Sequence, residues 1–146
     1  KDYIIIQEES GKIRILNRQG KTRIKVKGEI NFSTQEIYPY LSTFTGTDLQ
    51  GNLIQIDSRG NTLSSNLNLS KNHKMIIGHE SLVTLSENEL NVKGIPITLP
   101  YGNYTSPEVF KFNDTIYIST TDIESQKVYL FKENGKISCR DYRLFC

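Results

Sequence analysis

Apolar and polar residues alternate in many short stretches of this chain. The clearest stretch is residues 22–27, where Thr22, Ile24 and Val26 alternate with basic residues. A period of two is typical of a strand with one buried face, as in an antiparallel sheet. Ala, the best helix former, does not occur among the 146 residues, which argues against extensive helix. The sequence therefore predicts an all-β protein.

The strands recur in a fixed order. Four stretches each contain a short apolar strand, a polar turn, an alternating strand, a turn that closes on Gly, and a third strand. The closing glycines are Gly20, Gly60, Gly94 and Gly135, at intervals of 40, 34 and 41 residues. We expect positive φ at Gly20, Gly60 and Gly135, since Gly adopts it without steric cost. The expected strands cover residues 3–6, 12–16, 22–27, 40–44, 52–56, 62–69, 74–77, 82–85, 89–94, 95–99, 115–119, 127–131 and 136–144.

Alternation also predicts which side chains are buried, because successive residues of a strand point to opposite faces of the sheet. The residues expected to be mostly buried are Ile4, Ile6, Ile13, Ile15, Ile24, Val26, Ile54, Ile56, Ile116, Ile118, Val128 and Leu130.

Units of about 40 residues with three or four antiparallel strands are typical of β-propeller blades. Residues 11–20 (GKIRILNRQG) and 51–60 (GNLIQIDSRG) resemble repeats of the quinoprotein-dehydrogenase-like and WD-like propeller superfamily. The resemblance implies a single all-β domain of antiparallel β-meander repeats at approximately 1–36, 37–72, 73–108 and 109–146. No cofactor is expected, since the Trp docking motifs of quinoprotein blades do not occur. A β-sandwich is the alternative architecture.

The number of repeats bears on the expected partners. A propeller needs roughly four or more blades, and this chain holds at most three complete units and an incomplete fourth. We therefore expect a fragment of a larger propeller, or an open partial one, rather than a closed monomer. The strand at 3–6 and the segment at 136–146 would expose unpaired backbone groups. The expected partner is protein, either the rest of the propeller or another copy of this chain.

Charge is uneven along the chain, although the net charge is only +2. Residues 1–30 carry eight basic and four acidic residues. Two neighbouring strands would present a basic interaction face, and the alternative is a solvated outer strand whose lysines discourage pairing between sheet edges. Nucleic acid is not an expected partner, because aromatic residues are not interleaved with the basic ones. The possible basic face consists of Lys12, Arg14, Arg23, Lys25 and Lys27.

A second candidate region is the aromatic, Pro- and Gly-containing stretch at residues 99–107. Tyr101, Asn103 and Tyr104 could form a ligand loop, because loops at the edges of rigid sheets commonly bind. The alternative is a linker into the last repeat.

No residue pattern predicts a catalytic or metal site. His73 and His79 flank an apolar strand without the spacing of zinc motifs and are expected to lie in turns at the surface. No G-x-S-x-G or calcium-loop motif occurs. Cys139 and Cys146 are expected to be free thiols, with a small disulfide loop as the alternative. Asn-x-Ser/Thr sequons occur at 31–33, 68–70, 103–105 and 113–115, and they assign no compartment.

The function expected from these features is that of a non-catalytic binding or scaffold module within a β-propeller protein, mediating protein or ligand interaction. The alternative is a structural part of a larger hydrolase or dehydrogenase whose catalytic residues lie outside this chain. The longest apolar runs have three residues, which predicts no transmembrane helix. The protein is expected to be soluble; its compartment stays open, with a location outside the cytoplasm favoured.

Overall fold

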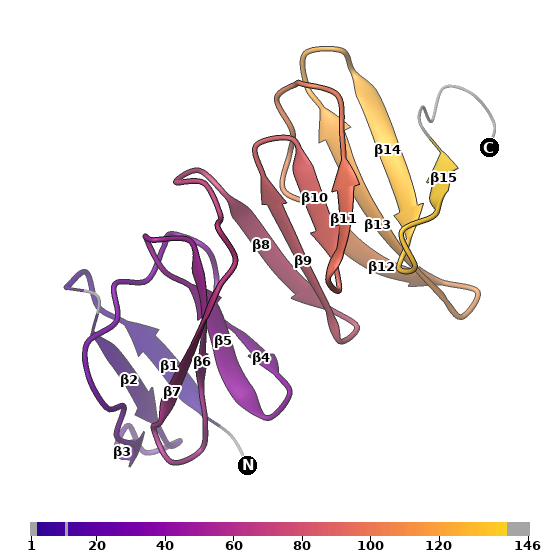
Figure 1. The fold of residues 1–146 in the computed structure, drawn as a ribbon. Helices are drawn as coiled ribbons and strands as arrows, with labels where there is room; N and C mark the ends of the chain where they lie inside the picture. The colour runs from indigo at the N-terminus through magenta and orange to yellow at the C-terminus, as the bar shows by residue number, and fades with distance from the viewer. Residues whose placement is uncertain (1–2, 11, 140–146) are drawn as a thin grey trace. The chain divides into compact units, whose positions relative to one another are not determined.

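The computed structural model of the chain describes residues 3–10 and 12–139. These residues form strands and no helix, so the all-β prediction is confirmed (Figure 1). Across the same residues there is accordingly no helix long and apolar enough to cross a membrane. Gly11, Cys146 and the end of the strand expected at 136–144 lie outside the described residues, as does the side chain of Cys139.

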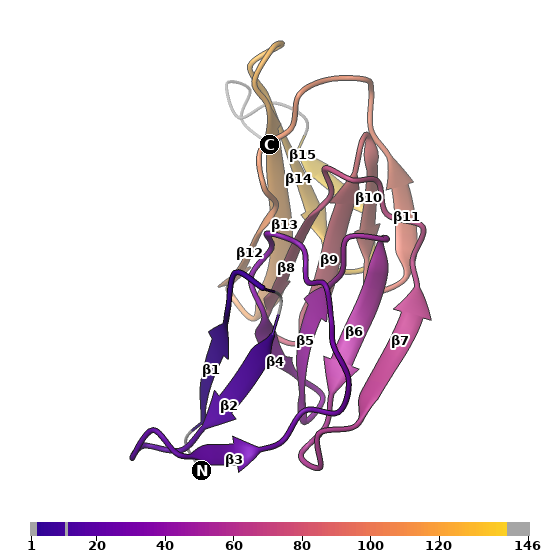
Figure 2. The same ribbon diagram turned by 90° about the vertical axis from the view of Figure 1, so that its left-hand side faces the viewer.

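The strands form four antiparallel sheets, each built from consecutive strands in chain order. The first sheet has three strands and the other three have four, as Figure 2 shows for β1–β3 and β4–β7. The first sheet contains β1 (Ile4–Gln7), β2 (Ile13–Leu16) and β3 (Thr22–Ile24). The second contains β4 (Tyr38–Tyr40), β5 (Thr43–Thr47), β6 (Asn52–Ile56) and β7 (Thr62–Asn66). The third contains β8 (Lys74–Gly78), β9 (Ser81–Ser86), β10 (Glu89–Val92) and β11 (Ile95–Thr98). The fourth contains β12 (Glu108–Phe112), β13 (Thr115–Asp122), β14 (Lys127–Lys132) and β15 (Ile137–Cys139).

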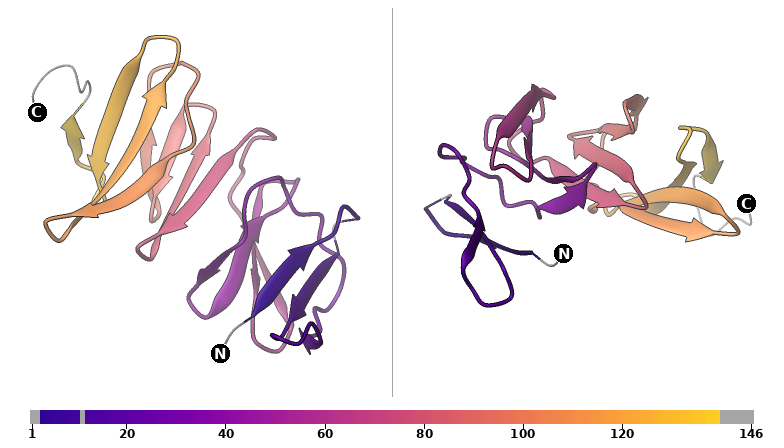
Figure 3. Two further views of the ribbon diagram at one scale, coloured as in Figure 1. Left: turned by 180° about the vertical axis from the view of Figure 1, so that it is seen from behind. Right: turned by 90° about the horizontal axis from the view of Figure 1, so that it is seen from below.

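The chain divides into two compact units, Lys1–Lys71 and Asn72–Cys146, with two sheets in each. In each unit one sheet packs face to face on the other; Figure 3 shows β12–β15 beside β8–β11 in the second unit. The core of the first unit contains Ile13, Ile15, Ile24, Ile30, Phe32, Ile54 and Ile56. The core of the second contains Val83, Leu85, Leu90, Val92, Leu99, Tyr104, Ile118, Tyr129 and Phe131.

Six of the twelve residues predicted to be buried are buried. They are Ile13, Ile15, Ile24, Ile54, Ile56 and Ile118. Val26, Ile116, Val128 and Leu130 are half-buried.

The prediction for β1 is wrong, because Ile4 and Ile6 are 44% and 40% exposed. Ile5 is paired with the fully buried Ile15, so it is Ile5 that faces the second sheet. Three consecutive isoleucines hide the alternation of this strand. The buried face of β14 was also misassigned, because its buried residues are Tyr129 and Phe131 rather than Val128 and Leu130.

The glycine-closed turns have the predicted geometry. Gly20, Gly60 and Gly135 have φ of 76°, 82° and 84°. In each of these turns a backbone N–H donates to the carbonyl four residues later, as from Asp57 to Asn61 at 3.0 Å. The same bond joins Glu8 to Lys12 and Asp48 to Asn52 in the preceding turns of the first and second sheets. Consequently Ile4 pairs with Leu16 as Phe44 pairs with Ile56, and β1 is the equivalent of β5, not of β4.

The first hairpin of the second and fourth sheets was not recognised in the sequence, whereas both strands of the first hairpin of the third sheet were expected, at residues 74–77 and 82–85. Strands β4 and β12 were missed because each joins the next strand through a two-residue turn without Gly. Both residues of these turns have positive φ, as at Leu41 (47°) and Ser42 (60°), which is the geometry of a type I′ turn. The pair in the fourth sheet is Asn113–Asp114, and the first hairpin of the third sheet has the same kind of turn at His79–Glu80.

Strand β3 is shorter than predicted, since it ends at Ile24 rather than at residue 27. Residues 25–27 leave the first sheet and run beside the turn of the second sheet that closes on Gly60. The amide of Lys27 donates to the carbonyl of Gly60 at 3.0 Å. A Cβ at Gly60 would lie 1.9 Å from the carbonyl oxygen of Lys25, so this glycine allows the two backbones to approach.

Gly20 and Gly60 distinguish two reasons for a glycine in a turn. Gly20 has positive φ with open space around it, whereas Gly60 has positive φ and a neighbouring backbone in close contact. G20A should lower the free energy of unfolding by about 1 kcal/mol, because it meets only the cost of positive φ. G60A should lower it further, by at least about 1 kcal/mol more, because its Cβ also overlaps the Lys25 carbonyl. Urea unfolding of both variants measures the difference. Equal losses would show that the contact with Lys25 does not restrict position 60.

Replacing Leu41–Ser42 by Asn–Gly should stabilise the protein by about 1 kcal/mol, because the new pair tolerates positive φ at both positions. Leu41 is 71% exposed, so little burial is lost. The control is Leu49→Asn, since Leu49 is also an exposed turn leucine but does not have positive φ. A gain in the urea midpoint that both variants share would contradict the explanation by turn geometry.

Candidate functional site

The five basic residues of the proposed face occupy four different settings. Arg14 lies on the outer face of the first sheet beside Ile6, and its guanidinium is 4.0 Å from the carboxylate of Glu8. The guanidinium of Arg23 lies 5.1 Å from the centroid of the Tyr3 ring, a cation–π contact. Lys12 precedes β2 and is exposed.

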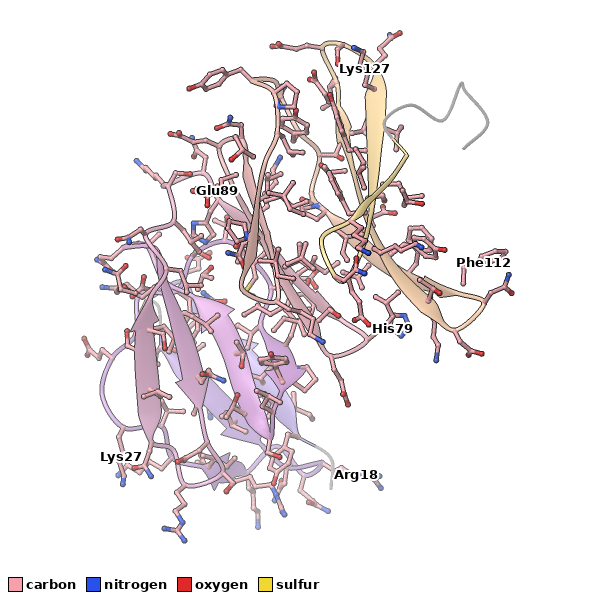
Figure 4. The ribbon with its side chains drawn as sticks, turned by 45° about the vertical axis from the view of Figure 1, so that its right-hand side comes forward. Arg18, Lys27, His79, Glu89, Phe112 and Lys127 are labelled. Atoms are coloured by element: carbon pink, nitrogen blue, oxygen red, sulfur yellow. The ribbon has the colours of Figure 1, made fainter. Side chains whose placement is uncertain are left out.

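Lys25 and Lys27 lie beyond the end of β3, where their backbone follows the second sheet. The ammonium of Lys27 donates to Asn61 Oδ1 at 2.8 Å. Figure 4 shows Lys27 and Arg18 at the same end of the first unit. The structure thus places Lys25 and Lys27 at one end of the two sheets rather than on a strand face shared with Arg14.

The loop at residues 99–107 is held to the fourth sheet. Tyr104 is 3% exposed, its hydroxyl donates to the carbonyl of Pro100 at 2.6 Å, and its own carbonyl accepts from the Lys74 ammonium. Asn103 donates its amide to Asp122 Oδ1 at 3.1 Å. Tyr101 is 90% exposed and projects from the loop. Of the three predicted loop residues, Tyr104 is therefore part of the core, and Tyr101 and Asn103 are exposed.

A segment in the first unit has the same construction. Phe32 and Asp48 form an isolated bridge, as do Tyr104 and Asp122. In both cases the residue before the aromatic one accepts a backbone hydrogen bond through its carbonyl, Asn31 from Leu49 and Asn103 from Ile123. Two of the sequons, at 31–33 and 103–105, thus coincide with a repeated structural segment in which an aromatic side chain is buried and the preceding Asn is exposed.

Burial is the main reason that the pKa of Tyr104 is raised to about 12, followed by the proximity of Tyr129 and of the Asp122 carboxylate. The pKa of Asp122 is lowered, chiefly because Ser125 donates a hydrogen bond to its Oδ2 at 2.5 Å. The two groups therefore keep opposite protonation states, a neutral phenol and an ionised carboxylate, which suit a structural pair.

The outer faces of the first and fourth sheets carry exposed apolar side chains. On the fourth sheet Phe110 and Tyr117 are cross-strand partners whose rings stack at 5.6 Å, and Leu130 pairs with Ser119 on the same face. Phe112 is 62% exposed, and Figure 4 shows it at the end of β12, pointing away from the ribbon. On the first sheet the corresponding exposed residues are Ile4 and Ile6.

A pocket of about 340 Å³ lies between the two sheets of the first unit. Its walls include three aromatic side chains, from Tyr3, Tyr40 and Phe44. Sequence reasoning missed this pocket, because its walls come from segments far apart in the chain and share no motif. The other lining residues are Ile24, Pro39, Ser42, Thr43, Ile56, Asp57 and Ser58.

Metal ligands do not cluster in the part of the chain that is described, where three or more His, Cys, Asp or Glu side chains never gather closely enough to hold an ion. His73 is buried, in contrast to the surface position expected for it, whereas His79 is exposed in the β8–β9 turn.

Tyr104→Phe should lower the free energy of unfolding by about 1 kcal/mol, because the hydrogen bond to Pro100 is lost. The fold holds this phenol neutral, so its contribution is complete below the ordinary tyrosine pKa of about 10 and is lost as the pH rises through about 12. The ultraviolet titration of the variant should lack one tyrosine with a midpoint near 12. Tyr101→Phe, in the same loop but exposed, is the control and should change neither property. Identical behaviour of the two variants would contradict the assignment of Tyr104 to the core.

Comparison with known proteins bears on the fold alone. No protein-family model matches the chain, and no curated protein matches its sequence. Among solved structures, the chain is similar to the crystal structure of the computationally designed Ika8 protein, with a TM-score of 0.60 and 11% sequence identity. The match covers 96% of this chain but only 46% of the designed one, so this chain spans less than half the length of that structure.

Proposed function

We propose that this chain is a partial β-propeller array that acts as a non-catalytic binding or scaffold module. Its partners would be sheets of the same kind, supplied by another copy of the chain or by further repeats. The observation that carries the proposal is the apolar outer face of the fourth sheet, with the stacked Phe110 and Tyr117 and the exposed Phe112. Exposed apolar patches of this kind mark interaction surfaces.

The arrangement of the sheets supports the propeller type. All four sheets are meanders of consecutive strands, and equivalent turns and hairpins recur in them. The likeness to the Ika8 structure extends over nearly the whole chain, while more than half of that structure has no counterpart here.

The outer face of the first sheet corresponds to a face that is buried elsewhere. Ile4 and Leu16 hold in the first sheet the positions of Phe44 and Ile56 in the second, and those two residues pack toward the first sheet. Ile4 and Ile6 are thus exposed on the side that, in the second sheet, is covered by the preceding sheet.

The outer face of the fourth sheet has the opposite character. Leu130 lies two residues before the closing turn of the fourth sheet, as Ile15 does in the first sheet, so the two positions are equivalent. Ile15 is fully buried against the sheet that follows. One end of the chain therefore presents a face suited to a following sheet, and the other a face suited to a preceding one. Each copy would carry both halves of a head-to-tail contact.

The test is light scattering of the chain across a hundredfold dilution, where we expect concentration-dependent association. Phe112→Ser and Ile6→Ser should each weaken it, because each removes apolar surface from one of the two faces. Leu41→Ser is the matched control, since Leu41 is 71% exposed but lies in a turn outside both faces. A chain that is monomeric throughout, or equal weakening by all three variants, would contradict the proposal.

A further inference from the structure

The pocket of the first unit has the composition of a site for a cation with an apolar surface. Tyr3 and Phe44 form adjoining walls, since their ring centroids are 5.6 Å apart and the ring planes meet at 84°. Tyr40 adds a third aromatic side chain, and Ile24, Pro39 and Ile56 add aliphatic surface. The face of an aromatic ring carries partial negative charge and attracts a cation within about 6 Å of its centroid.

The wall of the pocket also includes a carboxylate. Asp57 Oδ1 accepts hydrogen bonds from the amides of Arg59 and Asn61 at 2.8 and 2.9 Å, and Oδ2 accepts from the Asn61 side chain at 3.2 Å. These bonds, the one from the Asn61 amide foremost, lower the pKa of Asp57 and keep the group ionised at neutral pH. Among the described residues that line the pocket, Asp57 is the charged one.

One ring of this aromatic cluster already makes a cation–π contact within the protein. The guanidinium of Arg23, which is not among the lining residues, lies 5.1 Å from the centroid of the Tyr3 ring. An unmodified ammonium would suit the pocket poorly, because it is strongly hydrated and much of the lining is apolar. An ammonium that carries methyl groups loses little hydration on entering and fills the space between the rings.

We propose that this pocket binds an alkylated ammonium group, with Tyr3, Tyr40 and Phe44 surrounding the methyl groups and Asp57 supplying the counter-charge. The volume of about 340 Å³ lies at the lower end of the range for small-ligand sites and accommodates such a group with part of the chain that carries it. The group could belong to a small molecule such as choline or to a trimethylated lysine in a peptide. This inference does not rest on the association of sheets proposed above.

The experiment compares probes of one shape and different charge by calorimetry or by NMR titration of the full chain. Tetramethylammonium and choline should bind at millimolar concentrations, and 3,3-dimethylbutanol, the neutral analogue of choline, should bind at least about tenfold more weakly. A peptide with trimethyllysine, compared with choline and with the same peptide carrying unmodified lysine, distinguishes the two sources of the group. Equal binding of choline and 3,3-dimethylbutanol, or binding of none of the cations, would overturn the proposal.

Asp57→Asn is the decisive variant, because the turn should survive it. Asn17 holds the equivalent place in the first sheet, and its Oδ1 accepts the same two backbone hydrogen bonds, from Gln19 and Lys21 at 3.0 Å each. D57N should weaken choline binding by about tenfold while leaving urea unfolding nearly unchanged. Asp48→Asn, in the other turn of the same sheet and away from the pocket, is the matched control. Unchanged affinity in D57N, or the same loss in D48N, would contradict the role of the Asp57 carboxylate.

Discussion

Tight turns between consecutive strands set the register of the sheets. Turns in the first, second and fourth sheets join two strands through a backbone hydrogen bond to the residue four positions later. Positive φ at glycines such as Gly20, Gly51 and Gly60 allows this geometry. Side chains alternate between the faces of a strand, so a shift of one residue would exchange the buried and exposed sets. The register that the turns define thereby decides that Ile13, Ile15 and Ile24 meet the second sheet.

The candidate sites follow from that register. The pocket of the first unit exists because Tyr3, directly before β1, meets Phe44 of β5 in the facing sheet, and the turn that contains Asp57 brings a carboxylate to its wall. The same turn binds the segment after β3 through the bond from Lys27 to Gly60. A turn that orders the backbone also supplies the charge of the site, which explains how Asp57 can serve both purposes without a dedicated loop.

The loop at 99–107 illustrates how a stretch that is typical of a binding loop can be structural. Its aromatic, Pro- and Gly-containing composition suits ligand contact, but Tyr104 is buried in the core. The Asp122 carboxylate accepts a hydrogen bond from the backbone of the loop. Phe32 and Asp48 repeat the arrangement in the first unit. The recurrence indicates that these residues join the second strand of a sheet to the segment that leads into it.

Local sequence patterns were sufficient to predict the fold class, the closing turns and most of the strands. These depend on local properties: two-residue alternation, a composition without Ala, and the steric freedom of Gly20, Gly60 and Gly135. Alternation could not show which of the three consecutive residues from Ile4 to Ile6 point to the buried face of the sheet. It also could not reveal hairpins whose turns, such as Leu41–Ser42, adopt positive φ without Gly. The burial of Tyr104 beside an exposed Tyr101 is apparent only in the folded chain. Folding also brings Tyr3, Phe44 and Asp57 to one pocket. The physical reason is that burial and pocket formation depend on which sheet covers which face, a relation between residues far apart in the chain that no local pattern encodes.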